Sequence, residues 1–175
     1  MTAASGIHRY TLLQKNKMFS PSLLMVPVGA VISFPNADPF FHNVFSLFDG
    51  NRFDLGVYEA GSTKEVTLSR EGVSYIFCNI HPEMSAVVVS LSTSFYSGDD
   101  LRGTFHVHSV PPGVYSMHVW VEGEDQKNAR RADANGGNCG RSGRPRGSEA
   151  SRIPRPMTHT NKYGEKYDPG ESSPY

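Results

Sequence analysis

Residues 78–84 read Cys78-Asn79-Ile80-His81-Pro82-Glu83-Met84, and a second histidine lies upstream in Phe40-Phe41-His42-Asn43-Val44. One thiolate, two imidazoles and one thioether are therefore spaced as His…Cys-x2-His-x2-Met. A soft thiolate with two imidazoles in one plane, and a weak thioether on the axis, suits a blue-copper site. A lone cysteine or methionine is more often a core residue. All four donors together predict one copper ion, held by His42, Cys78, His81 and Met84.

The same stretch resembles the cupredoxins, and its short loop is similar to that of amicyanin rather than the longer loop of plastocyanin. A wider span resembles bacterial plastocyanin-like or "methylamine utilization" proteins. The matching segments cover about half the chain and are residues 19–21, 26–29, 34–36, 42–46, 53–56 and the 78–84 loop. This resemblance implies an all-β, cupredoxin-like Greek-key β-sandwich. It also implies a type-1 (blue) copper protein that carries one electron between redox partner proteins, an unidentified dehydrogenase or cytochrome.

The resemblance implies roles for residues around the metal as well. Asn43 is expected to tie the two ligand-bearing segments together by hydrogen bonds, because partners that orient the ligands are usual around metal sites. The ring edge of His81 is expected to reach the surface. Pro82 is expected to stiffen the loop, since proline fixes its own backbone angle and lacks an amide donor.

The first half of the chain alternates short apolar segments with turn residues, as in β-sandwiches. Residues 53–61 contain two glycines and are interpreted as a structured loop. No window shows a sustained helical period. We therefore expect a copper-binding domain over residues 1–92, with strands at 8–13, 22–25, 28–34, 42–48, 65–68, 73–78 and 86–91.

Residues 103–121 form a different pattern, with two apolar segments flanking Pro111-Pro112-Gly113. The pattern predicts a β-hairpin within residues 93–123, and it resembles a fragment of a carboxypeptidase regulatory-like domain. Placing the apolar residues on one face puts three histidines on the other. Those imidazoles could form a second metal cluster, although a polar, solvent-facing strand explains them more simply. They are His106, His108 and His118.

Residues 124–175 are rich in arginine, glycine and serine and poor in large apolar side chains. Such a composition buries too little surface to offset its ordering cost, so we expect a disordered tail. The part after Thr158 is expected to be either unstructured or draped over the domain. The 124–157 part is either a natural linker or an out-of-frame translation. A disulfide between Cys78 and Cys139 is the alternative use of the two cysteines, but it would remove the thiolate.

Charge and hydropathy limit the partners. Seventeen basic residues balance seventeen acidic ones, so no net charge points to nucleic acid, and no apolar run is long enough to span a membrane. Residues 1–8 do not form a signal peptide. We nevertheless expect the protein to work in the periplasm or otherwise outside the cytoplasm, with its export signal lying upstream of Met1.

Four donors around one metal leave no open position for a substrate, so an enzyme is not expected. Two alternatives to an electron carrier remain. The first is a module that binds or delivers copper without redox cycling. The second is a surface module with a structural or carbohydrate-binding role, and only the 103–121 pattern suggests it.

Overall fold

The computed structural model describes residues 8–47, 50–98, 102–118, 120, 131–134 and 161–166. These ranges contain strands, turns and loops with no helix, which confirms the predicted all-β class. None of the described residues forms a helix long and apolar enough to cross a membrane. The chain divides into two compact units, Met1–Ser94 with Thr158–Tyr175, and Phe95–Met157.

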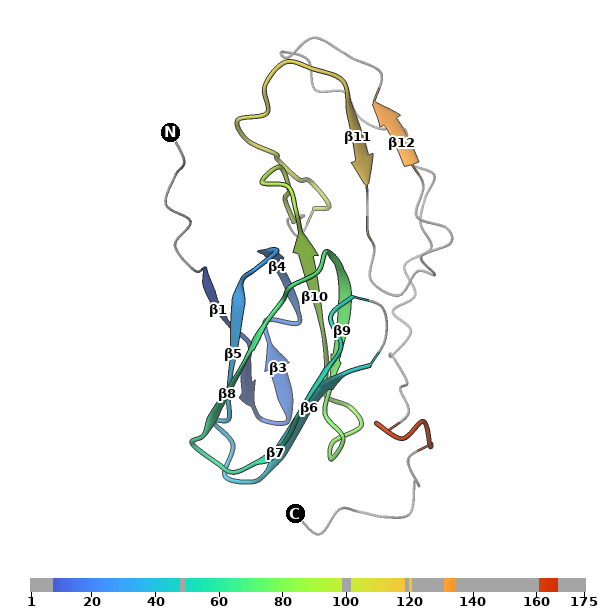
Figure 1. The fold of residues 1–175 in the computed structure, drawn as a ribbon. Helices are drawn as coiled ribbons and strands as arrows, with labels where there is room; N and C mark the ends of the chain where they lie inside the picture. Colours follow the sequence, from blue (N-terminus) through green and yellow to red (C-terminus); the bar gives the residue numbers. More distant parts are fainter. Residues whose placement is uncertain are drawn as a thin grey trace. The chain divides into compact units, whose positions relative to one another are not determined.

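The first unit is built from two facing sheets and a small hairpin (Figure 1). The larger sheet has the order β4-β10-β9-β6-β7, and the smaller has the order β1-β5-β8. The bounds of the strands are β1 Arg9–Thr11, β2 Leu13–Lys15, β3 Met18–Ser20, β4 Leu23–Pro27, β5 Val31–Pro35, β6 His42–Ser46, β7 Phe53–Tyr58, β8 Thr63–Thr67, β9 Gly72–Phe77 and β10 Ser85–Leu91.

A single hydrophobic core joins the two sheets. Ile32 and Phe34 of β5 enter it from the smaller sheet, and Val44 of β6 and Ile76 of β9 enter it from the larger. Each of these side chains is fully buried or nearly so. The apolar residues alternate along β5, as expected for a strand with one face on the core. This shared core makes the first unit a β-sandwich.

Strands β2 and β3 form a hairpin whose two-residue loop is Asn16-Lys17. Both loop residues have positive φ, at 56° and 55°. Two positive φ angles in a two-residue hairpin loop define a type I′ turn, which matches the twist of the strands. Asparagine tolerates this conformation, whereas a lysine there is less common.

The sequence located seven strand regions, and the structure places a strand in each of them. The interpretation of residues 53–61 as a loop is wrong, because this segment contains β7, which pairs with β6. Two features hid this strand. Gly56 takes a positive φ of 70° inside it, and a register irregularity in the β6–β7 pairing interrupts the apolar alternation.

The β-hairpin predicted over residues 103–121 does not form among the described residues of the second unit. Residues 104–108 are not a strand, and β11 (Tyr115–His118) pairs instead with β12 (Arg131–Ala134) in an antiparallel ladder. Strand β12 also falls inside the segment expected to be disordered. Pairing between distant segments has overridden the local apolar pattern that suggested a hairpin. The rest of residues 124–157 lies outside the described residues.

Gly50 and Asn51 are held against the larger sheet. The Asn51 backbone amide donates to Ser74 Oγ at 2.9 Å. The Asn51 side chain donates from Nδ2 to the Arg70 carbonyl at 2.8 Å, and its Oδ1 accepts from the Arg70 amide at 3.0 Å. A Cβ on Gly50 would lie 2.6 Å from the Val73 carbonyl oxygen. Gly29 has the same φ of 87° as Gly50, but a Cβ there would meet nothing within 4 Å.

This pair of glycines tests directly whether Gly50 lies against the Val73 backbone. Gly29→Ala should cost about 1–2 kcal/mol of unfolding free energy, because it only places an alanine at positive φ. Gly50→Ala should cost a further ~1–3 kcal/mol, because the methyl group also collides with the Val73 backbone. Urea unfolding of both variants measures the difference. Equal losses would contradict the close approach.

Candidate metal site

The three strongest donors come from two strand ends and one loop. His42 is the first residue of β6, and Cys78 directly follows β9. The loop after Cys78 is closed by backbone hydrogen bonds from Cys78 N to Met84 O at 3.3 Å and from Met84 N to His81 O at 3.0 Å. Pro82 is therefore the second residue of a β-turn, a position that suits its fixed φ. The stiffening role of Pro82 stays a prediction.

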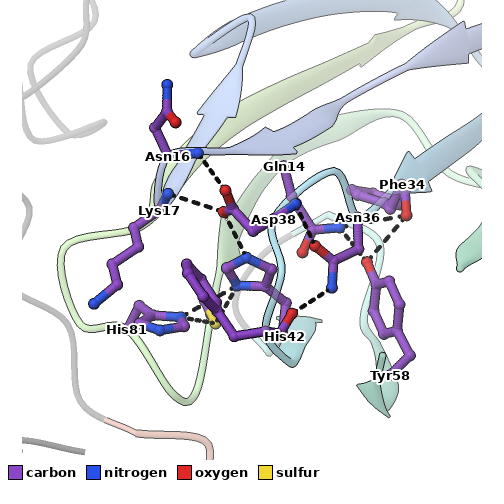
Figure 2. A network of polar contacts seen from close by, with 11 residues as sticks. Gln14, Asn16, Lys17, Phe34, Asn36, Asp38, His42, Tyr58 and His81 are labelled. Atoms are coloured by element: carbon purple, nitrogen blue, oxygen red, sulfur yellow. Dashed lines mark hydrogen bonds and ion pairs between the residues drawn. The ribbon is translucent and has the colours of Figure 1, made fainter. Parts of the chain in front are cut away.

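The Nδ1 atoms of His42 and His81 and the Sγ atom of Cys78 face one another (Figure 2). The two nitrogens are 3.2 Å apart, and the sulfur lies 3.8 Å from His42 Nδ1 and 3.6 Å from His81 Nδ1. A point about 2 Å from all three atoms lies inside that triangle, close to the usual metal–imidazole and metal–thiolate distances. The three residues can therefore ligate a single metal ion.

All three donors are buried. His42 and Cys78 have no exposed surface, and His81 is 3% exposed. Met84 belongs to the same loop and is buried in the hydrophobic core. Its role as the fourth, axial ligand stays a prediction. Buried polar donors that are not compensated destabilise a fold, and one bound cation would compensate all three.

The surroundings of Cys78 have opposite effects on its pKa. Burial raises the pKa of the thiol, whereas the backbone amides of Asn43, Ile80 and His81 donate hydrogen bonds to the sulfur and partly offset the rise. The net pKa lies above its usual value, so the metal-free group is a buried thiol. A metal must therefore displace a proton before the sulfur can bind it.

The pKa of His81 shifts downward instead. Burial lowers it, and the nearby His42 ring and the Lys17 ammonium lower it further. A low pKa keeps the ring neutral, which is the form that binds metals. The expected exposure of the His81 ring edge is wrong. Phe40 packs against this ring with centroids 5.3 Å apart, and Nε2 is buried without a hydrogen-bond partner among the described residues.

The far side of the His42 ring contacts Asp38, a residue that the sequence did not single out. His42 Nε2 lies 2.9 Å from Asp38 Oδ2. Burial raises the Asp38 pKa, but hydrogen bonds from the Lys17 amide, the His42 ring and the Asn16 amide outweigh burial and lower it overall. A carboxylate four residues before a predicted histidine ligand is the signal that could have identified it.

Asn43 contributes mainly through its backbone. Its amide donates to the Cys78 sulfur and so links β6 to the loop. Its side chain donates to Asp54 Oδ1 on β7 at 2.8 Å. The side-chain oxygen is buried and has no partner among the described residues. The role of the Asn43 side chain as a tie between the two ligand-bearing segments stays a prediction.

A short segment near the C-terminus contacts the same region. The Lys162 amide donates to Asn79 Oδ1, and the Lys162 ammonium pairs with Asp54 Oδ2, each at 2.9 Å. Residues 161–165 form a turn in which the Asn161 amide donates to the Glu165 carbonyl and the Gly164 amide donates to the Asn161 carbonyl. Of the two expectations for this part of the tail, the contacts with Asp54 and Asn79 favour the draped one for residues 161–166.

The second histidine cluster is not assembled. The rings of His106 and His108 stack with centroids 6.3 Å apart, and His118 is exposed on β11. Within the described part of the chain, the one set of three or more His, Cys, Asp or Glu side chains with converging ligand atoms is His42, Cys78 and His81. The hairpin that should have gathered the other three does not form, which explains the difference.

Comparison with known proteins gives structural neighbours only. No family model and no curated protein matches the chain. Similar solved structures include a copper-containing nitrite reductase from Thermus scotoductus (22% identity, 47% of this chain, TM-score 0.45). They also include a purple cupredoxin from Nitrosopumilus maritimus (24%, 46%, 0.42) and a reduced amicyanin mutant (20%, 51%, 0.44).

The match covers 22% of the reductase, 98% of the purple cupredoxin and 86% of amicyanin. The structural neighbours of this chain are thus cupredoxins and a copper enzyme of which it spans about a fifth. At these identities and TM-scores, assignment of the metal site rests on the donor geometry of the chain itself. The carboxypeptidase-like resemblance of residues 93–123 stays a prediction.

Metal binding should release a proton from Cys78. The raised thiol pKa means that the metal-free protein holds this proton at neutral pH, so apparent affinity should rise about tenfold per pH unit up to the thiol pKa. Calorimetric titration with Zn²⁺, a redox-inert probe, in buffers of different ionisation enthalpy measures the released proton. An affinity that does not change with pH would exclude Cys78 as a ligand.

The Lys162 contacts should protect the adjacent backbone. Lys162→Met removes the ion pair with Asp54 and should cost only about 0.2–1 kcal/mol, because the pair is partly exposed. It should, however, speed hydrogen exchange of the amide at position 162. Lys166→Met is the matched control, since Lys166 is exposed. Equal exchange at position 162 in both variants would show that the ion pair does not hold the segment.

Proposed function

We propose that the chain is a type-1 (blue) copper protein that carries one electron at a time between larger redox proteins. The observation that supports this most directly is the convergence of two imidazole nitrogens and one sulfur within 3.8 Å of one another. Thiolate and imidazole together select copper, zinc or iron–sulfur chemistry, and a nearby thioether favours copper. Met84 would supply that thioether.

Bound copper would supply a one-electron couple between Cu(II) and Cu(I). The chain contributes a fixed donor frame. His42 is anchored in β6, which is buried along its whole length, and the Cys78–Met84 loop is closed by its own backbone hydrogen bonds. Donors held in this way change position little between oxidation states, and a small rearrangement favours fast transfer.

The proposal includes partners and a location. An electron carrier needs a donor and an acceptor, and a dehydrogenase and a cytochrome are the protein classes that fit. We place the protein outside the cytoplasm, in the periplasm or an equivalent space, because cytosolic thiol pools compete for copper. We propose no enzymatic activity, since four protein donors leave no position for a substrate.

The test is to load the protein with Cu(II) and record its visible spectrum and its voltammetry. We expect intense thiolate-to-Cu(II) absorption and a reversible one-electron wave. Cys78→Ser should abolish the colour. Met84→Leu should leave a coloured site with a raised potential, because only a weak axial bond is lost. Met25→Leu, in β4, is the matched control and should change neither property.

Other outcomes would identify the alternatives. Tight copper binding without colour or reversible cycling would overturn the electron carrier in favour of a copper-delivery module. Sugar binding by a protein that takes up no copper would favour a surface structural or carbohydrate-binding module instead.

A further inference from the structure

Asp38 is the centre of a buried hydrogen-bonded group behind the His42 ring (Figure 2). The carboxylate is 5% exposed, and the imidazole that it contacts has no exposed surface. Asp38 Oδ2 accepts from His42 Nε2 at 2.9 Å and from the Lys17 amide at 3.0 Å, while Oδ1 accepts from the Asn16 amide at 2.6 Å. Each oxygen of the carboxylate thus has a donor.

The two backbone amides that donate to Asp38 come from the type I′ turn of the β2–β3 hairpin. Asn16 and Lys17, both at positive φ, present consecutive backbone amides to one carboxylate. Consecutive amides arranged in this way form an anion-binding concavity. Asn36 completes the support by accepting the Asp38 amide at 3.0 Å and donating to the Phe40 carbonyl at 2.8 Å.

These contacts restrict the His42 ring to one chemical form. The Asp38 carboxylate already accepts hydrogen bonds from two backbone amides and has no proton to donate to the ring. In a neutral His42 ring, the nitrogen that contacts it, Nε2, therefore carries the proton. Nδ1 is then the bare nitrogen, and it is Nδ1 that faces Cys78 Sγ and His81 Nδ1. By contrast, His81 Nε2 has no partner among the described residues. The two histidines are therefore supported unequally.

We propose that Asp38 is a positioning residue that fixes His42 as an Nδ1 donor and places a buried negative charge against the metal site. This inference rests on the proposed copper site. A negative charge stabilises the more highly charged metal ion, so Asp38 favours Cu(II) over Cu(I) and lowers the midpoint potential. The Asn16-Lys17 turn keeps that charge in place and becomes part of the site.

The charge argument takes the neighbouring groups into account. The Lys17 ammonium lies 5.5 Å from the centre of the Phe40 ring. Its positive charge has the opposite effect to Asp38 on the His81 pKa. Glu83 acts in the same direction as Asp38 on the His81 ring. Asp38 differs from both in its burial and in its direct hydrogen bond to a donor ring, and charges exert their largest effects where water is excluded.

The first measurement needs no metal and no variant. Nitrogen-15 shifts of the His42 ring in the metal-free protein, at mildly alkaline pH, should show the proton on Nε2 and a bare Nδ1. A proton on Nδ1 would overturn the positioning role. If the protein bound no copper but showed this tautomer, the proposed function would fail while the positioning of His42 by Asp38 would stand.

The second measurement uses Asp38→Asn, which keeps an acceptor for His42 but removes the charge, and Asp38→Ala, which removes both. Cu(II) affinity should fall about 10–100-fold in Asp38→Ala, which is usual for loss of a ligand-orienting partner. In both variants Cu(I) affinity should fall less, and the midpoint potential should rise. Glu65→Gln is the matched control, because it removes an exposed carboxylate on β8 and should change neither value.

Two results would overturn the charge effect. One is an equal loss of affinity for Cu(I) and Cu(II) in Asp38→Asn, which leaves the potential unchanged. The other is a rise in potential of the same size in Glu65→Gln, which would reflect net charge rather than the buried contact.

Discussion

Strand β6 lies between β7 and β9 in the larger sheet, and the metal site depends on this placement. The antiparallel pairing of Phe45 with Phe77 fixes the register, so that the start of β6 and the chain leaving β9 lie at the same edge of the sheet. His42 begins β6, and Cys78 directly follows β9. Because side chains alternate along strands, a shift of one residue would move His42 to the opposite face.

The same placement has an energetic consequence. β6 is buried at all five positions, including the polar residues His42, Asn43 and Ser46. Burying polar side chains stabilises a fold only when each finds partners. Asp38 supplies one for the His42 ring and Asp54 for the Asn43 side-chain nitrogen, and both carboxylates receive backbone amides as well. Asn43 Oδ1 and Ser46 Oγ have no hydrogen-bond partner among the described residues. The site is therefore surrounded by a hydrogen-bonded network rather than by apolar side chains alone.

The sequence revealed His42, Cys78 and His81 because these residue types are specific for metals and two of them lie only three positions apart. It also revealed the strands that carry clear apolar alternation. It did not reveal Asp38, because the role of Asp38 depends on the distant Asn16-Lys17 turn. The 161–166 contact and the β11–β12 pairing escaped for the same reason: their partners are far away in the chain.

The metal donors are unevenly distributed along the chain. Cys78 and His81 remain neighbours even in an unfolded polypeptide, whereas His42 is 36 residues from Cys78 and approaches only when β6 pairs with β9. A soft metal ion can therefore bind the loop before the sandwich exists. Binding to the unfolded chain reduces the stabilisation that a ligand gives to the native state. His42 is then the donor that links metal affinity to folding, and the loop alone could capture the ion during synthesis.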